Sequence, residues 1–230
     1  MKLGTALVVG GTGGLGEQVV PALQAAGFLT VFTGRRQDGL DRLARDVPGS
    51  IPRLLDGADP EATRRLIAEV DAAHGLTAYV HLAGGFAMGP PIDHLDERAW
   101  EAMFSMNWQS LRNGAGSALG AFRRRRGGSI VTIGSLAAFS GGAKMAPYAV
   151  SKAAVVAFTR CLAEEGKEFG VRANCVVPGI LDTPGNRAAM PDADRSGWIS
   201  CGQVASAIVF LCSPASVGVN GATILMKGGL

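Results

Sequence analysis

An apolar, β-branched run at residues 5–9 leads directly into a glycine-rich turn at residues 10–16 and then into a helical pattern through Ala26. Strand, glycine turn and helix in this order are the context in which such glycines have a functional meaning. Because glycine lacks a Cβ atom, the backbone of the turn can approach a pyrophosphate, and the helix N-terminus supplies N–H donors. The hydroxyl of Thr12 can add a hydrogen bond to the phosphate or the ribose. An ordinary tight turn is the alternative interpretation.

Strands and helices alternate along the rest of the chain. Helical patterns at residues 60–74, 96–122, 147–169 and 203–212 separate apolar runs of strand length, which lie at residues 29–33, 51–55, 78–82, 129–134, 171–177 and 222–226. Such alternation is typical of a parallel sheet whose right-handed crossovers place helices on both faces. No internal repeat or linker interrupts it. We therefore predict a single α/β domain over residues 1–230, a Rossmann-type doubly wound sheet of about seven strands.

The composition agrees with one large domain. Of the 230 residues, 47% are hydrophobic, 18% are charged and 33 are glycine, as expected for a buried sheet with many tight turns. A net charge of +3 gives no indication of nucleic-acid binding. The arginine run at residues 123–126 is interpreted as a solvated helix C-terminus, with a phosphate-binding or partner surface as the alternative.

The cysteines and the N-terminal segment bear on the cellular environment. Cys161, Cys175, Cys201 and Cys212 form no Cys-x-x-Cys pair, so we expect reduced thiols and neither a disulfide framework nor a metal site. The chain enters its first strand without a charged leader, and no apolar run approaches the roughly 20 residues of a membrane span. We therefore expect a soluble cytoplasmic protein that binds neither membrane nor nucleic acid.

Residues 135–152 bring a hydroxyl, a phenol and an ammonium together in the sequence. Tyr148 and Lys152 are four residues apart, which places both side chains on one face of a helix. A nearby cation favours the phenolate, so we expect Lys152 to lower the pKa of Tyr148 and to make it a tunable acid or base. Ser135, on the preceding loop, could hydrogen-bond a substrate oxygen. A buried tyrosine beside a surface lysine is the alternative.

The end of the second strand bears on the choice of dinucleotide. In dinucleotide-binding folds an acid about 20 residues beyond the glycines binds the ribose 2′-hydroxyl, whereas an arginine accommodates a 2′-phosphate. Here that place holds Gly34, Arg35 and Arg36, and the next acid is Asp38. The sequence therefore favours NADP(H) over NAD(H). A pair of solvated arginines would give the same pattern.

Asp56 and the pair Ala83-Gly84 follow the third and fourth strands. Parallel sheets bind ligands at this edge, so the Asp56 carboxylate could accept a hydrogen bond from an adenine amino group. It could instead cap the next helix, for which Asp59 before Pro60 is the better candidate. The small residues Ala83 and Gly84 would let the backbone lie against a cofactor.

Taken together, these residues resemble the classical short-chain dehydrogenase/reductases over essentially the whole chain. The resemblance rests on motifs that occur in order, which are the glycine turn, Ala83-Gly84, Asn107, Ser135, Tyr148-x-x-x-Lys152, and Pro178-Gly179 with Thr183. It implies that Tyr148 is the general acid in reduction and that Ser135 orients the carbonyl. It further implies that Lys152 lowers the pKa of Tyr148 and binds the nicotinamide ribose, while Asn107 holds a water that links Lys152 to solvent.

The same resemblance assigns residues to the cofactor. The pyrophosphate would be wrapped by Gly10, Thr12, Gly14, Leu15 and Gly16. The adenosine side would be lined by Asp56, Ala83 and Gly84. The nicotinamide carboxamide would be held by Pro178, Gly179, Ile180 and Thr183. The cofactor carries the hydride, and the protein supplies orientation and proton delivery.

Three features depart from the family pattern. Val9 stands where the family usually has threonine, and His81-Leu82 replaces the usual pair of asparagines, so other hydrogen bonds must brace the central strands. We interpret His81 as a core histidine, with a site role as the alternative. The segment after Thr183 forms a short substrate lid around residues 184–200. This lid is similar to that of the quinonoid dihydropteridine reductases, which generally lack a serine equivalent to Ser135.

The sequence therefore predicts an NADP(H)-dependent oxidoreductase that reduces a ketone, or oxidises a secondary alcohol, by hydride transfer with Tyr148 as general acid or base. The lid motivates an alternative, reduction of a pterin or a similar flat heterocycle. A non-catalytic dinucleotide-binding regulatory protein is a further alternative, although a pure binder has no need of Ser135 and Asn107. Because members of this family are commonly homodimers or homotetramers, we also expect self-association through the helices at 96–122 and 147–169.

Overall fold

The computed structural model describes residues 3–228 and is built around a parallel sheet of seven strands. The two residues at each end of the predicted 1–230 domain lie outside the described part. The strands are ordered β3-β2-β1-β4-β5-β6-β9, so the chain first builds outward from β1 and then restarts on its other side at β4. Their bounds are Gly4–Val9 (β1), Phe28–Gly34 (β2), Ile51–Leu54 (β3), Leu76–His81 (β4), Gly128–Ile133 (β5), Val171–Pro178 (β6) and Thr223–Met226 (β9). The predicted doubly wound sheet is confirmed.

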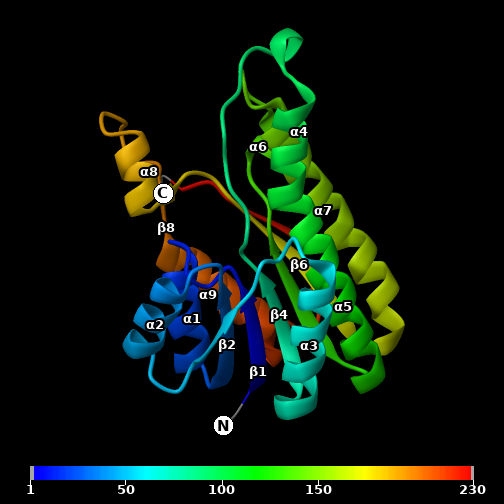
Figure 1. Cartoon of the computed structure of the whole chain (residues 1–230). Coiled ribbons are helices and arrows are strands. Elements are labelled where there is room, and N and C mark those ends of the chain that lie inside the picture. The colour runs from blue at the N-terminus through cyan, green and yellow to red at the C-terminus, as the bar shows by residue number, and fades with distance from the viewer. Residues whose placement is uncertain (1–2, 229–230) are drawn as a thin grey trace.

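Helices cover both faces of this sheet (Figure 1). One face carries α1 (Gly16–Ala25), α2 (Gln37–Asp46) and α9 (Cys201–Cys212), and the other carries α3 (Pro60–His74), α5 (Ser110–Arg125) and α7 (Ala146–Gly166). Alternate residues of β1 enter the two cores, with Leu7 and Val9 on the α3, α5 and α7 side and Ala6 and Val8 on the other. Full burial of a side chain such as Leu7 stabilises the fold by about 1.5–3 kcal/mol.

The long helix predicted at residues 96–122 is interrupted. Instead, α4 (Glu97–Phe104) passes into a π-helical turn (Ser105–Gln109), and α5 follows. A π turn inserts one extra residue into a helix and is common where a side chain must be redirected. Here it holds Asn107, whose amide bonds to a loop far away in the sequence. The helical period predicts the helix but carries no signal for this local widening.

The predicted lid also contains regular structure. It includes the short helix α8 (Pro184–Ala189), and its ends form the two-residue strands β7 (Leu181–Asp182) and β8 (Ile199–Ser200), which pair in parallel. A further short helix, α6 (Ala137–Ser140), follows β5. Single 3₁₀ turns lie at Ile92–His94, Lys167–Phe169 and Pro214–Ser216.

The arginine run at the end of α5 ties three helices together. Arg125 forms an ion pair with the nearly buried Asp71 of α3, and Arg124 lies 3.7 Å from the same carboxylate. Arg123 reaches Glu165 of α7 at 3.4 Å. The run therefore has a structural role that neither sequence interpretation included, because a composition argument cannot show which acids lie opposite.

Two other sequence questions are answered by local structure. The side chain of Asp59 caps α3 by accepting from the N–H groups of Glu61 and Ala62, so Asp56 is not the cap of that helix. Each of the four cysteines is free, and three of them are buried, with Cys161 exposed. Within residues 3–228, no helix combines the length and apolar character needed to cross a membrane.

Candidate active site

The predicted site residues lie at the carboxyl edge of the sheet, around the point where the strand order restarts. Backbone hydrogen bonds join the loops that follow these strands. The N–H of Ala83 donates to the carbonyl of Val9 (3.0 Å), and the N–H of Leu136 donates to the carbonyl of Pro178 (3.2 Å). The glycine turn after β1 faces the lid, since a Cβ atom on Gly14 would stand 3.2 Å from the Thr183 methyl carbon. Segments far apart in the sequence therefore meet at one edge, as the parallel topology predicts.

The glycine turn is shaped to receive a phosphate group. Gly10 has a φ of 86°, and a Cβ atom there would stand 2.7 Å from the Ala83 nitrogen, so a larger residue fits neither the conformation nor the space. A Cβ atom on Gly16 would stand 2.3 Å from the Gly11 carbonyl oxygen. The residues Gly13 and Gly14 are exposed, and within the described chain no side chain caps α1. The backbone N–H groups at the N-terminus of α1 therefore fit a pyrophosphate, whose oxygens would accept the hydrogen bonds that no side chain of the described residues accepts.

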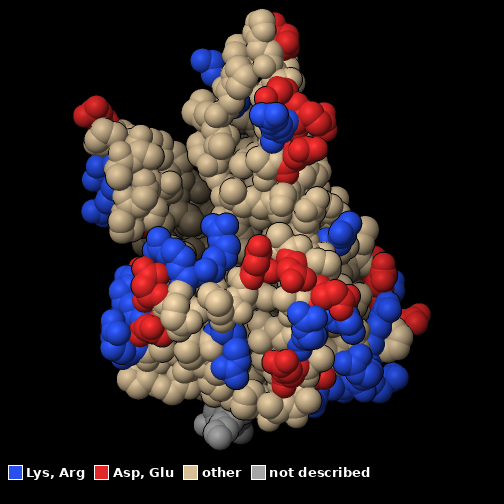
Figure 2. All heavy atoms as spheres, viewed as in Figure 1, with Lys and Arg blue, Asp and Glu red and all other residues tan. Residues whose placement is uncertain are grey.

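Gly34, at the end of β2, packs directly against Thr12. A Cβ atom on Gly34 would stand 2.6 Å from the Thr12 hydroxyl oxygen, so any side chain at this position, a carboxylate included, requires Thr12 to shift. Arg35 and Arg36 follow with exposed side chains, and Arg36 lies 3.3 Å from Asp38. Figure 2 shows basic side chains gathered near the carboxyl ends of β2 and the start of α2. This neighbourhood suits an anionic group on the adenosine ribose.

Asp56 is exposed at the same edge of the sheet. Its Oδ1 accepts a hydrogen bond from the N–H of Ala58 at 3.0 Å, which forms a local turn. One carboxylate oxygen is thus used by the loop that follows β3. The position beyond β3 agrees with the predicted contact to an adenine.

Tyr148, Lys152 and Ser135 meet beyond β5. Tyr148 is half-buried in the first turn of α7, and the Ser135 hydroxyl interacts with its phenol and opposes the effect of burial on its pKa. Lys152 lies one turn later, is 7% exposed, and donates from Nζ to the carbonyl of Ile133 at 3.1 Å. Burial lowers the pKa of Lys152 to about 8, and Cys175 opposes that shift.

Two observations bear on the predicted effect of Lys152 on the pKa of Tyr148. Burial raises the pKa of Tyr148, and the opposing contribution comes from Ser135. The four-residue spacing places both groups on one helix face, but the Lys152 ammonium points to the Ile133 carbonyl. Burial thus sets the direction of the shift, and the effect of Lys152 on the pKa of Tyr148 stays a prediction.

Asn107 is buried between the loop after β4 and α7. Its Oδ1 accepts from the Gly85 N–H at 2.9 Å, and its Nδ2 donates to the Gly85 carbonyl and the Ser151 hydroxyl, each at 3.1 Å. A Cβ atom on Gly84 would stand 2.7 Å from Asn107 Oδ1 and 3.2 Å from Lys152 Nζ. The amide oxygen and the ammonium therefore converge over Gly84, where small size is required.

His81 lies in the core. Its Nδ1 is 2.8 Å from the Tyr79 hydroxyl and its Nε2 is 3.2 Å from the Ser110 hydroxyl. Burial, with a smaller contribution from Lys152, lowers the pKa of His81 to about 3, so the imidazole is neutral at physiological pH. The structure agrees with the core-histidine interpretation.

The lid begins with Thr183, which caps α8 by accepting from the Asn186 N–H at 3.1 Å. Arg187 on α8 binds the Asp182 carboxylate through two hydrogen bonds of 2.5 and 2.7 Å. In Figure 1, α8 stands away from the sheet, opposite the loop that follows β4. Figure 2 shows a hollow between these parts whose visible walls are uncharged.

Phe86 is a site residue that the sequence reasoning did not find. Its ring packs edge-on against the ring of Tyr148, with centroids 4.9 Å apart, yet it is 55% exposed. Other large apolar side chains that are exposed on the neighbouring segments are Met88, Phe139 and Ile180. The signal that could have found Phe86 is its position, two residues beyond the Ala83-Gly84 pair at a strand end.

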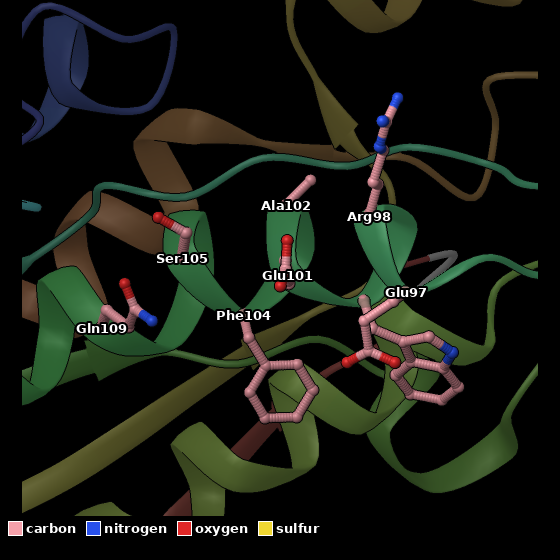
Figure 3. A pocket seen from close by; sticks show the side chains of 8 residues that line it. Glu97, Arg98, Glu101, Ala102, Phe104, Ser105 and Gln109 are labelled. Atoms are coloured by element: carbon pink, nitrogen blue, oxygen red, sulfur yellow. The ribbon is translucent and has the colours of Figure 1, made fainter.

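An open cavity of about 890 Å³ lies elsewhere, on the outer side of α4 and the π turn. Figure 3 shows that its lining comes from one continuous helical run, with Glu97 and Arg98 on one turn, Glu101 on the next and Gln109 further along. It includes none of the predicted site residues. Because its lining comes from the outer side of one helical run, we treat it as a surface feature and not as part of the candidate active site.

A parallel sheet in this order, with a glycine turn at its switch point and a serine, tyrosine and lysine beyond β5, defines a dinucleotide-dependent oxidoreductase. Comparison with known families agrees, because the short chain dehydrogenase model matches residues 4–194. The chain belongs to this family. It is accordingly an NAD(P)-dependent oxidoreductase that acts on CH–OH or C=O groups and binds a nicotinamide dinucleotide.

Individual relatives cover nearly the whole chain. The 3-oxoacyl-(acyl-carrier-protein) reductase FabG of Salmonella typhimurium is 26% identical, over 98% of this chain and 96% of its own. A short-chain type dehydrogenase/reductase from Mycobacterium ulcerans has a solved structure that superposes with a TM-score of 0.94 at 30% identity, covering 100% of this chain and 90% of that one. A gluconate 5-dehydrogenase from Burkholderia cenocepacia, solved with NADP and tartrate, gives a TM-score of 0.91 at 27% identity, covering 100% of this chain and 96% of that one.

Proposed function

We propose that this enzyme is an NADP(H)-dependent reductase of a ketone, with Tyr148 as the proton donor, and that it can oxidise the corresponding secondary alcohol in reverse. The observation that carries the proposal is the convergence of Tyr148, Ser135, Lys152 and Asn107 beyond β5. A dinucleotide-binding protein without catalysis has no use for a buried ammonium and a buried amide beside a protonated phenol.

The proposed roles follow from the contacts. The dinucleotide, when bound, supplies the hydride. Tyr148 donates its proton to the carbonyl oxygen, and Ser135 hydrogen-bonds the same oxygen and orients it. Lys152, one helical turn after Tyr148, contributes a positive charge. Asn107 fixes the loop of Gly84 and Gly85 and directs its amide oxygen toward Lys152.

The proposed cofactor contacts are those assigned from the sequence. The glycine turn would hold the pyrophosphate through Gly10, Thr12, Gly14, Leu15 and Gly16. Asp56, Ala83 and Gly84 would line the adenosine side, and the nicotinamide end would be held by Pro178, Gly179, Ile180 and Thr183. The closure of the Gly34 position by Thr12 and the exposed guanidinium groups of Arg35 and Arg36 support NADP(H) over NAD(H). The NADP bound in the gluconate 5-dehydrogenase structure agrees with this preference.

The proposed substrate is an uncharged, largely apolar carbonyl compound. Phe86 lies against the phenol, Phe139 lies on α6 shortly after Ser135, and Ile180 follows β6, and all three side chains are exposed. Arg187 on the lid is bound to Asp182 and is not available to a substrate carboxylate without losing that ion pair. An exposed aromatic ring at this position also favours the second candidate, a pterin or a similar flat heterocycle, which could stack on it.

A titration of NADPH and NADH, followed by nicotinamide fluorescence, tests the cofactor assignment before any substrate is known. We expect NADPH to bind more tightly, and Arg35→Ala to weaken NADPH about tenfold or more, the loss expected for one charge-assisted hydrogen bond, with NADH within about twofold. Arg45→Ala, on the exposed surface of α2, is the matched control. Equal or tighter binding of NADH would overturn the NADP assignment.

Turnover on a panel of aryl and alkyl ketones, beside quinonoid dihydropterin, then separates the two substrate candidates. Ketone turnover with NADPH supports the main proposal. Turnover of the dihydropterin alone would replace it with the second candidate.

We also propose that the chain is a single dinucleotide-binding domain over residues 1–230 with a substrate lid around 184–200, and that it forms homodimers or homotetramers. The mixed acidic and basic side chains of the α4 surface, Glu97, Arg98 and Glu101, suit a symmetric contact with a second copy. Light scattering at micromolar concentration tests this, and a monomer mass would refute it.

A further inference from the structure

A buried chain of polar side chains connects the core of the sheet to the helix that carries Asn107. Tyr79 and His81 lie on one face of β4, and Ser110 is the first residue of α5. The three side chains are 0%, 3% and 6% exposed. The Tyr79 hydroxyl reaches α5 because the helix has glycine at position 114, where a Cβ atom would stand 1.8 Å from that oxygen. The sheet and the helix are therefore fitted to one another around this chain.

The hydrogen bonds allow one consistent arrangement of protons. The Ser110 hydroxyl donates to the Met106 carbonyl at 3.1 Å, so it must accept from His81 Nε2 at 3.2 Å. The other ring nitrogen of the neutral imidazole, Nδ1, is then an acceptor and receives the Tyr79 O–H at 2.8 Å. Each donor is used, and the chain ends on a carbonyl inside the π turn.

The end point of the chain is next to a proposed catalytic residue. Met106 directly precedes Asn107 in the π turn Ser105–Gln109, and Ser110 closes the turn on its C-terminal side. Asn107 reaches Gly85 and Ser151 from this widened turn, and a regular helix would rotate the side chain about the helix axis away from them. The carbonyl of Met106 is thus held at the point where the helix geometry changes.

We propose that His81 and Ser110 are positioning residues for Asn107: the Tyr79–His81–Ser110 chain fixes the π turn and so sets where the Asn107 amide oxygen lies relative to Lys152. The proposal rests on the catalytic role proposed above for Lys152 and Asn107. It also gives a use to the histidine that departs from the family pattern, since His81 reaches across to α5 with both ring nitrogens occupied.

The protein provides a matched control for the test, which is Ser117. Ser117, also on α5, donates to the carbonyl of Asn113 at 2.9 Å and so makes the same local bond four residues back as Ser110 makes to Met106. Within residues 3–228 the Ser117 hydroxyl makes this hydrogen bond and none to His81. Replacing either serine by alanine removes one hydroxyl from the same helix.

The experiment compares Ser110→Ala, Ser110→Thr, Tyr79→Phe and Ser117→Ala in the full chain. Amide hydrogen exchange is measured at Gly85 and through residues 105–109, together with NADPH affinity and, with a turned-over ketone, kcat and KM. We expect Ser110→Ala to speed exchange at Gly85 and to lower kcat about tenfold through misplacement of Asn107, with KM and NADPH affinity within about twofold. Ser110→Thr restores both readouts, and Ser117→Ala leaves both unchanged.

Tyr79→Phe keeps the ring that fills the core and removes the first donor, so it tests the chain even if Ser110→Ala does not fold. We expect it to change Gly85 exchange and kcat in the same direction as Ser110→Ala. Exchange at Gly85 that matches the Ser117→Ala control in both variants would overturn the proposal. Faster exchange at Gly85 with unchanged kcat would also overturn the proposal, because the Tyr79–His81–Ser110 chain would then have a structural role only. Exchange and NADPH affinity are measured without substrate, so failure to find a ketone substrate bears on the proposed function and leaves this test intact.

Discussion

Replacement of Gly34 by alanine tests the packing of Thr12 against the position proposed to face the adenosine ribose. A Cβ atom there would stand 2.6 Å from the Thr12 hydroxyl oxygen, 2.7 Å from its methyl carbon and 3.2 Å from a methyl carbon of Leu40. Overpacking of this kind lowers the free energy of unfolding by about 1–3 kcal/mol. Because the two closest atoms are both lost in Thr12→Ala, we expect the double variant Thr12→Ala/Gly34→Ala to recover at least about 1 kcal/mol of that cost.

Reversible urea unfolding measures the free energy of unfolding for the wild type, both single variants and the double variant. Gly39→Ala is the matched control, because its Cβ atom would lie 3.5 Å from Thr12 Cβ, an ordinary contact, within α2. We expect Gly39→Ala to stabilise the protein by about 0.5–1 kcal/mol, as alanine is the better helix former. A Gly34→Ala protein as stable as the wild type, or a double variant with no recovery, would refute the reasoning.

The same site connects packing to cofactor choice. In a Thr12→Ala background the space needed by a side chain at position 34 is partly open, so Gly34→Asp places a carboxylate where a ribose 2′-substituent is expected. A carboxylate repels a 2′-phosphate and accepts from a 2′-hydroxyl, so the NADPH-to-NADH affinity ratio is expected to fall about tenfold or more. The fluorescence titration described above measures this ratio. An unchanged ratio would place the ribose elsewhere.

Three further predictions concern the reactive groups and the helix contacts. Tyr148→Phe is expected to lower kcat about 100-fold to 10,000-fold, the usual contribution of a general acid, and near-native turnover would exclude Tyr148 as the proton donor. The rate of reduction should fall as the pH rises through about 8, where Lys152 loses its proton, and a flat pH–rate profile across that range would show that this charge is not used. Asp71→Ala removes the acceptor of Arg125 and of the Leu76 N–H and is expected to cost about 1–3 kcal/mol in urea unfolding. The exposed Glu61→Ala, which loses its pair with Arg64, should change the free energy of unfolding much less.

The parts of the fold that sequence predicts well are those with local signals. The turn at residues 10–16, the cap at Asp59 and the strand patterns each depend on neighbours in the chain, and the structure has them close to where they are expected. The π turn could not be predicted in this way. Asn107 is unfavourable in a helix interior, and its burial is compensated by Gly85 and Ser151, which are 22 and 44 residues away.

The site was predictable as a set of residues but not as an electrostatic environment. Spacing alone places Tyr148 and Lys152 on one helix face, and it suggests an interaction between them. The structure shows that the Ile133 carbonyl accepts from Lys152, and that burial has the larger effect on the pKa of Tyr148. Both outcomes depend on how β5 and the Phe86 loop pack around α7, which no local pattern encodes. The arginine run on α5 is a further case, since Asp71 and Glu165 come from other helices.

The protonation of Tyr148 bears on the favoured direction of the reaction. Burial raises the pKa of its phenol, so the proton needed to convert an alkoxide to an alcohol is present across the neutral range. The ring of Phe86 packs against the phenol, with centroids 4.9 Å apart. Oxidation of an alcohol needs the phenolate instead, and this form becomes abundant only in alkaline solution. If Tyr148 is the proton donor, as we propose, the oxidative rate should rise with pH while the reductive rate falls.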